Sequence, residues 1–226
     1  MRRATGRVRS LAYHHVVPRY DAATALIVVD VQNDFAHPSG SLYVSDGESV
    51  IPLVNAQVEE ALAAGAYVFY TQDWHPPSTP HFAKDGGIWP VHCVADSWGA
   101  RFHPNLTVRG PVVRKGTQGE DGYSAFTMRD AASGETTATE LDALLHEAGV
   151  THLVIVGLAT DYCVLATALD ARRGGYPATV LTAGIRAVEL AAGDGARAIE
   201  RMRQAGVIVA EESGDASGAT AARTGH

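Results

Sequence analysis

The sequence predicts a three-layer α/β/α protein with helices on both faces of a central sheet of six mostly parallel strands. Two observations predict this fold class. Short apolar runs recur along the chain, and most of them are separated by segments in which apolar residues have helical spacing. Parallel strands need long, right-handed crossover connections, so this alternation favours a parallel sheet. The 226 residues suffice for one sizeable core.

The apolar runs place the six expected strands at residues 25–29, 66–71, 111–114, 153–156, 178–182 and 207–210. Helices are expected at residues 50–64, 136–148, 162–173 and 188–205. Gly65 and Gly149 end the first two of these helices, because glycine is common just past a helix C-terminus. We expect the run GEDGYSAF at residues 119–126 to be a loop.

The two ends of the chain do not share this pattern. Residues 1–22 are basic but lack a continuous apolar stretch, so we expect a partly disordered extension rather than a signal peptide. Residues 212–226 are rich in Ser, Gly, Ala and Thr, and we expect a disordered tail. The remaining residues, 23–211, are then a single domain.

The composition excludes several classes of protein. A formal net charge of −7 argues against nucleic acid or an anionic membrane as a partner. No apolar run approaches the roughly 20 residues of a membrane-spanning helix. The two cysteines form no disulfide framework and suit a reducing cytoplasm. The sequence does not determine the oligomeric state, and a homo-oligomer is compatible with it.

The run LVIVGLATDYCVLATALD at residues 153–170 carries the first candidate for catalysis. It predicts a buried strand, a turn at residues 159–161 that Thr160 or Asp161 caps, and a helix with Cys163 in its first turn. The N–H groups and the dipole of a helix start favour a thiolate and lower its pKa. The same N–H groups are suited to hold an oxyanion. The alternative is that Cys163 is a small core residue.

Two charged residues follow other expected strands. Asp30 comes directly after residues 25–29, where a buried carboxylate is costly unless it is paired or used. Its alternative role is to cap the next turn. Lys115 ends residues 111–114 and would lie near Asp30 if both strands end at the same sheet edge, where it would stabilise a carboxylate and a thiolate. The alternative is an exposed surface lysine.

A third group of polar residues follows the second expected strand. A carboxylate and three imidazoles form a set suited to Zn²⁺, Fe²⁺ or Mn²⁺ in an open, catalytic site. The members of this set are Asp73, His75, His81 and His92. With ten histidines in the chain, solvated loop histidines are the alternative. A stiff proline-rich loop at residues 76–80 makes His81 the least secure of the four.

The chain resembles the nicotinamidase/pyrazinamidases of the isochorismatase-like cysteine hydrolases. The resemblance covers residues 25–210, and its motifs occur in the family's order. They are VDVQNDF at 29–35, TQDWHPPSTPHF at 71–82, WPVHCV at 89–94, VRKG at 113–116 and GLATDYCVLATALDA at 157–171. The resemblance implies the isochorismatase-like hydrolase fold and the hydrolysis of nicotinamide, and also of pyrazinamide.

The resemblance also implies roles for individual residues. It implies a catalytic triad of Asp30, Lys115 and Cys163, and an oxyanion hole formed by the backbone N–H groups of Ala159 and Cys163 after a cis Leu158–Ala159 peptide. It implies one divalent ion, zinc first and iron or manganese otherwise, held by Asp73, His75, His81 and His92. It implies a substrate pocket that includes Phe35, Trp89, Tyr123 and Leu158.

The resulting expectation is a nicotinamidase that acts through a Cys163 thioester while the metal orients the substrate ring. One alternative is a relative that hydrolyses another small amide or an N-carbamoyl compound. The other alternative is a metal-binding scaffold that is not an enzyme. The four metal ligands argue against the first alternative, because many members of the superfamily lack them.

Overall fold

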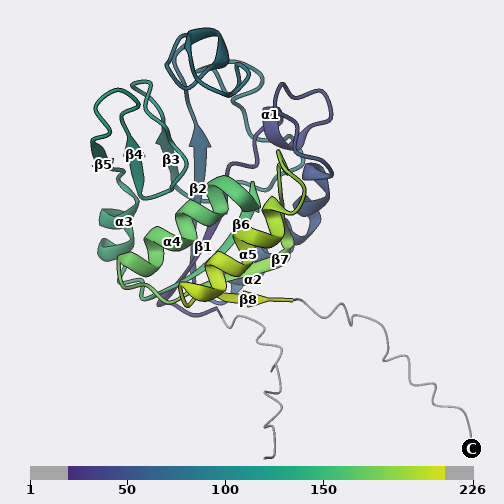
Figure 1. Ribbon diagram of the computed structural model, residues 1–226. Coiled ribbons are helices and arrows are strands. Elements are labelled where there is room, and N and C mark those ends of the chain that lie inside the picture. The colour runs from purple at the N-terminus through teal and green to yellow at the C-terminus, as the bar shows by residue number, and fades with distance from the viewer. Residues whose placement is uncertain (1–19, 212–226) are drawn as a thin grey trace, which may run out of the picture.

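The computed structural model describes residues 20–211, and a parallel six-stranded sheet forms its centre (Figure 1). The strand order is β3-β2-β1-β6-β7-β8, and every neighbouring pair is parallel. The strands are β1 (Thr24–Val29), β2 (Tyr67–Asp73), β3 (Val112–Lys115), β6 (His152–Leu158), β7 (Ala178–Arg186) and β8 (Ile208–Ala210). The expected fold class, a three-layer α/β/α protein with six central strands, is therefore confirmed.

Helices cover both faces of the sheet. Helix α2 (Ile51–Ala63) packs on one face, and α3 (Leu141–Glu147), α4 (Leu165–Arg173) and α5 (Asp194–Gln204) pack on the other. Figure 1 shows α4 and α5 in front of the sheet and α2 behind it. The remaining helical segments are short: α1 (Asn33–Ala36), the 3₁₀ turns η1 (Gly47–Val50) and η2 (Ala83–Asp85), and the π-helical turn η3 (Thr160–Val164).

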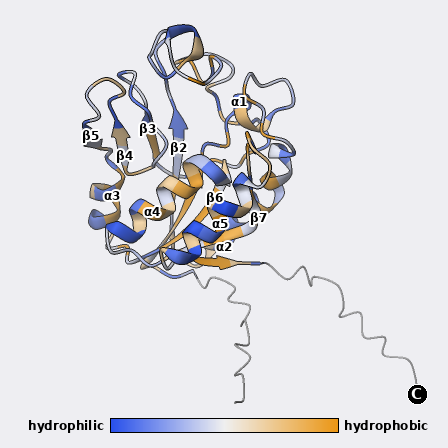
Figure 2. Cartoon of the chain, in the orientation of Figure 1, coloured by the Kyte–Doolittle hydropathy of each residue, from blue (hydrophilic) through white to orange (hydrophobic). Residues whose placement is uncertain are grey.

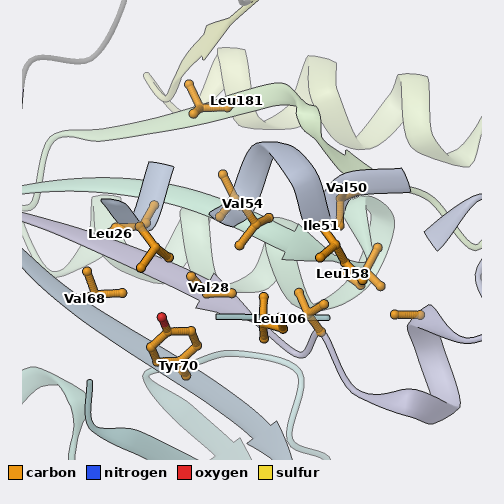
Figure 3. Packing of buried hydrophobic residues seen from close by; sticks show 14 of the residues in the cluster. Leu26, Val28, Val50, Ile51, Val54, Val68, Tyr70, Leu106, Leu158 and Leu181 are labelled. Atoms are coloured by element: carbon orange, nitrogen blue, oxygen red, sulfur yellow. The ribbon is translucent and has the colours of Figure 1, made fainter. Parts of the chain in front are cut away.

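Alternate residues of the central strand supply the two halves of the core. In β1, Leu26 and Val28 point toward α2, whereas Ile27 and Val29 point toward α4 and α5. Figure 3 shows Leu26 and Val28 packed with Val54 of α2. Both faces of β1 are buried, which explains its continuous apolar run. In Figure 2 the hydrophobic colour accordingly concentrates on the central strands, while α5 is largely hydrophilic on its outer side.

The expectation of a helix over residues 136–148 was wrong at its start. Residues Thr136–Ala138 form β5, which pairs antiparallel with β4 (Thr127–Arg129) in a separate two-stranded sheet. The Thr139 hydroxyl oxygen then accepts a hydrogen bond from the backbone N–H of Leu141 at 3.2 Å, so the helix begins only there. Three exposed residues with two β-branched threonines suit a hairpin better than a helix.

The helix expected at residues 188–205 also begins later, at Asp194. Its first residues form a loop that carboxylates hold in place. Asp161 accepts hydrogen bonds from the backbone N–H groups of Val188 and Glu189, each at 2.9 Å. Glu189 in turn accepts from the N–H groups of Gly193 and Gly195. These contacts satisfy the backbone outside a helix, and β7 extends to Arg186.

The topology divides at the centre of the sheet. The chain proceeds from β1 outward to β3 on one side and from β6 outward to β8 on the other. The carboxyl ends of β1 and β6 therefore flank a switch point, the place where open α/β sheets bind ligands. Above this edge lies the long segment that follows β2, at the top of Figure 1.

Among residues 20–211, no helix is both long and apolar enough to cross a membrane. The segments expected to be disordered were residues 1–22 and 212–226, of which residues 1–19 and 212–226 lie outside the described residues. Residues 20–22 are described, and Tyr20 is buried.

One glycine of β6, directly opposite Val29 of β1, provides a stability test. Gly157 has φ +114°, and an added Cβ would lie 2.1 Å from the Val29 carbonyl oxygen. We expect Gly157→Ala to lower the free energy of unfolding by at least about 2 kcal/mol, measured by chemical denaturation. Gly149→Ala is the matched control, because Gly149 has φ +68° but no atom within 4 Å of an added Cβ. Equal losses in the two variants would contradict the clash between β1 and β6.

Candidate active site

The sequence-predicted triad converges at the carboxyl edge of the sheet. Asp30 follows β1, Lys115 is the last residue of β3, and Cys163 lies in η3 directly after β6. Asp73 ends β2 and is the register partner of Lys115. Four strands thus each contribute one chemically active side chain to the same place.

Lys115 contacts all three of the other side chains in this cluster. Its Nζ donates a hydrogen bond to Asp30 Oδ2 at 2.7 Å and also donates to Asp73 Oδ1 and the Gly122 carbonyl oxygen. The Cys163 Sγ lies 3.7 Å from the same nitrogen. The side chain is fully buried, so the alternative of a surface lysine was wrong. Burial opposes the charge of the ammonium, but the two carboxylates raise the pKa of Lys115 well above its usual value.

Asp30 is a buried carboxyl group that shares this environment. Its Oδ1 accepts a hydrogen bond from the Thr71 hydroxyl at 2.6 Å. Burial raises the pKa of Asp30 to about 6, and the nearby Asp73 carboxylate adds to this, while the Lys115 ammonium opposes it. A carboxyl group with a pKa near neutrality is suited to accept and return a proton.

Cys163 is also buried, and its geometry differs in part from the expectation. Neither Thr160 nor Asp161 caps η3 through its side chain, since Asp161 bonds to the loop at residues 188–189 instead. Burial raises the pKa of the Cys163 thiol well above its usual value, although the Lys115 ammonium lowers it. The expected lowering of this pKa was therefore wrong, because loss of solvation outweighs the helix start. The resting thiol needs a base, and an oxygen of Asp30 lies within 4.8 Å of its sulfur.

The backbone next to Cys163 has the form that the resemblance implies. The Leu158–Ala159 peptide bond is cis. Ala159, with extended backbone angles, precedes η3 and lies at the cavity together with Cys163.

The expected metal ligands also come together. Ligand atoms of His75, His81 and His92 lie within 4.8 Å of one another, and all three rings are buried. Asp73 Oδ2 lies 3.8 Å from His75 Nε2 and 3.9 Å from His92 Nε2. The alternative of solvated loop histidines was therefore wrong. The structure places His81 in the cluster despite the preceding prolines, with its ring stacked on His75 at a centroid distance of 4.9 Å.

The chemistry of this cluster fits a divalent ion. Both ring nitrogens of His75 are buried without a hydrogen-bond partner, which is costly unless another group satisfies them. Burial lowers the pKa of His92 to about 4, so this imidazole is neutral at pH 7, as a ligand must be. Burial opposes the charge of Asp73, yet the Lys115 ammonium and the imidazoles lower the pKa of this carboxyl. Three imidazoles and one carboxylate form a donor set for zinc, iron or manganese.

A cavity with mostly apolar walls lies between the histidine cluster and Cys163. The four expected pocket residues line it: Phe35, Trp89, Tyr123 and Leu158. The Trp89 Nε1 donates a hydrogen bond to the Tyr123 hydroxyl oxygen at 2.7 Å, which fixes one wall.

Three further lining residues escaped the sequence analysis: Leu42, Tyr162 and Val188. Tyr162 packs edge-on against Trp89 with ring centroids 4.8 Å apart. Its position directly before Cys163 was a signal that could have identified it. Leu42 and Val188 come from loops in which no local pattern distinguishes them.

Known proteins are similar to this chain in sequence and in fold. The isochorismatase domain model matches residues 24–213. A nicotinamidase of Escherichia coli is 37% identical over 203 residues, which cover 82% of this chain and 93% of that protein.

Two solved structures are similar over most of their length. The structure of PnC1 from L. infantum in complex with nicotinate has a TM-score of 0.77 at 34% identity, covering 87% of this chain and 96% of the other. The structure of a pyrazinamidase of Pyrococcus horikoshii in complex with zinc has a TM-score of 0.74 at 36% identity, covering 84% and 99%. The sequence match and the shared fold together show that the chain belongs to the isochorismatase domain family.

Proposed function

We propose that this protein is a nicotinamidase, which hydrolyses nicotinamide to nicotinate and ammonia through a thioester on Cys163. The observation that carries the proposal is the joint presence, around one small apolar cavity, of a buried Asp30–Lys115–Cys163 cluster and a site of three histidines and Asp73. The names of the similar proteins support the same substrate class.

In the first step Asp30 takes the proton of the Cys163 thiol. The proximity of the two groups and the pKa of Asp30 near 6 suit this transfer. The Lys115 ammonium, 3.7 Å from the sulfur, stabilises the thiolate as it forms. The thiolate then attacks the carboxamide carbon, and the C=O electron pair moves to the oxygen.

The backbone N–H groups of Ala159 and Cys163 hold the resulting oxyanion, a kind of contact that lowers the barrier by roughly 3–4 kcal/mol per donor. When the C–N bond breaks, protonated Asp30 gives its proton to the leaving amine, so ammonia departs. A water molecule then attacks the thioester while Asp30 takes one of its protons. The C–S bond breaks, Asp30 returns its proton to the departing Cys163 thiolate, and the nicotinic acid loses its own proton to solvent to give nicotinate.

The pyridine ring is held by the aromatic walls of the cavity, where Phe35 and Trp89 contact its faces. We assign the ion to Asp73, His75, His81 and His92, as zinc first and iron or manganese otherwise, since the P. horikoshii pyrazinamidase is in complex with zinc. When bound, the ion supplies a Lewis acid for the ring nitrogen and lowers the pKa of a coordinated water. Pyrazinamide, which keeps a nitrogen in the same position, is the second substrate that we propose.

Two remaining features follow from this function. A catalytic thiol persists in reducing surroundings, so we place the enzyme in the cytoplasm. A substrate as small as nicotinamide is the only partner that the reaction requires.

The first prediction concerns the substrate. The purified protein should release ammonia from nicotinamide and pyrazinamide, and chelation should reduce this activity until zinc is restored. An N-carbamoyl amino acid and a ureide, assayed in parallel, should be poor substrates because they offer no pyridine ring to the aromatic walls. Faster release from either of these compounds than from nicotinamide would favour the alternative amidohydrolase class.

The second prediction separates the two cysteines. Cys163→Ala should lower kcat by at least about 10⁴-fold while nicotinamide still binds, because the aromatic walls remain. Cys93→Ser is the control, since Cys93 is buried in the hydrophobic core, does not line the cavity, and donates its thiol to the Gly99 carbonyl oxygen at 3.9 Å. Iodoacetamide should alkylate Cys163 faster than Cys93, because Cys163 lines the cavity and has Asp30 beside it as a base. An active Cys163→Ala variant would exclude the thioester, and an inert Cys163 in an inactive wild type would favour the scaffold alternative.

The third prediction concerns the ion pair. Asp30→Asn and Lys115→Met should each reduce kcat by several orders of magnitude, and the double variant should be little worse than either single variant, because the two groups act as one unit. The check is kcat for all three variants on folded protein, verified by circular dichroism. Losses that multiply in the double variant would mean that Lys115 acts independently of Asp30.

A further inference from the structure

One carboxylate next to the histidine cluster has no role in the sequence analysis or in the proposed reaction. Asp121 lies in the loop between β3 and β4, and its Oδ1 is 2.6 Å from His81 Nδ1. The Asp121 side chain is 20% exposed and that of His81 is 4% exposed, so water screens this contact only in part.

This contact determines which nitrogen of His81 faces the cluster. A carboxylate accepts hydrogen bonds and cannot donate them, so the proton of the imidazole resides on Nδ1. Nε2 then keeps the lone pair that can bind a cation, and the rings of His75 and His92 lie at centroid distances of 4.9 and 5.4 Å from that of His81. A carboxylate behind an imidazole orients the ring and makes it a stronger ligand.

The three histidines differ in this respect. His92 Nδ1 meets only the neutral Pro90 carbonyl oxygen, at 2.8 Å, and His75 has no hydrogen-bond partner on either nitrogen. His81 alone of these three faces a carboxylate with its outer nitrogen. We propose that Asp121 is a positioning residue for the metal site, which holds His81 in the tautomer and orientation that bind a divalent cation.

His81 needs such support because of its place in the chain. It follows the proline-rich segment, and loop residues hold its backbone: its N–H donates to Thr79 Oγ1 at 3.2 Å, and its carbonyl oxygen accepts from the Trp89 N–H at 3.4 Å. The Thr79 hydroxyl in turn donates to the Gly119 carbonyl oxygen at 2.6 Å. These bonds position the backbone of His81. The hydrogen bond to Asp121 is what fixes the rotation of the ring.

The backbone of Asp121 is anchored independently of its side chain. Its N–H donates to the Arg129 carbonyl oxygen at 2.8 Å, and its own carbonyl accepts from the Arg129 N–H at 3.0 Å. The next two residues contact Lys115 and Trp89, through the Gly122 carbonyl oxygen and the Tyr123 hydroxyl. A change confined to the Asp121 side chain should therefore leave the loop and these contacts in place.

The experiment measures zinc affinity, and it rests on the proposed function in assuming that this site binds metal. The full-length protein is stripped with a chelator and titrated with Zn²⁺ in competition with a chromophoric chelator. Asp121→Ala should raise the Kd for zinc by roughly 10- to 100-fold, and Asp121→Asn, which keeps an acceptor without the charge, should raise it less. Glu120→Gln is the matched control, since this neighbouring carboxylate bonds to the Gln118 N–H and not to a histidine.

A second readout needs neither metal nor activity. In ¹⁵N NMR spectra of the metal-free protein, His81 should be the Nδ1–H tautomer in the wild type and should lose this preference in Asp121→Ala. The Asn variant keeps the shape of the side chain and remains informative if the Ala variant does not fold. Zinc affinities of both variants within about twofold of wild type, or an unchanged tautomer, would overturn the proposal. A wild-type protein that binds no zinc would overturn the metal site itself, whereas normal wild-type binding with unaffected variants would overturn only the role of Asp121.

Discussion

The burial of the Lys115 ammonium is the interaction on which the rest of the site depends. An ion taken out of water is costly unless opposite charges and hydrogen bonds surround it, and here Asp30, Asp73 and the Gly122 carbonyl oxygen do so. Burial is the main cause that raises the pKa of Asp30, the Asp73 carboxylate adds to it, and the Lys115 ammonium opposes it. The nearby imidazole cluster faces the other oxygen of Asp73. Asp73 therefore links the acid–base group and the histidine cluster into one electrostatic system.

Much of this system could be predicted because strand ends are readable in a sequence. An apolar run followed at once by a charged residue places that residue at the carboxyl edge of a parallel sheet, as at Asp30. Lys115 lies at the same edge, one residue after Arg114. The position of Cys163, just after a buried strand, could also be predicted. The direction of its pKa shift could not, because it depends on how fully the thiol is buried and on its distance to each charge, which only the folded chain determines.

What could not be predicted lies where local pattern and tertiary contact disagree. Thr136 and Thr137 precede α3 and were expected to belong to that helix. They instead form β5, which pairs with β4, and the spacing of apolar residues does not reveal this pairing. The start of α5 was misplaced because Asp161, far away in the sequence, satisfies the backbone of residues 188–189. Asp121 was read as part of a loop, and only the fold brings it to His81. For Asp161 and Asp121 the deciding partner is distant in sequence, whereas β4 lies only a short turn before β5.

The segment after β1 illustrates how a short motif serves two purposes. Asp30 supplies chemistry, but the residues that follow supply geometry. Gln32 donates to the Asp73 carbonyl oxygen at 2.8 Å and accepts from its N–H at 2.9 Å, as a neighbouring strand would. Asp34 accepts from the N–H of Cys93 at 2.7 Å and thereby holds the loop that carries His92. Because buried backbone groups must be paired, these two side chains position Asp73 and the loop of His92, two of the proposed metal ligands.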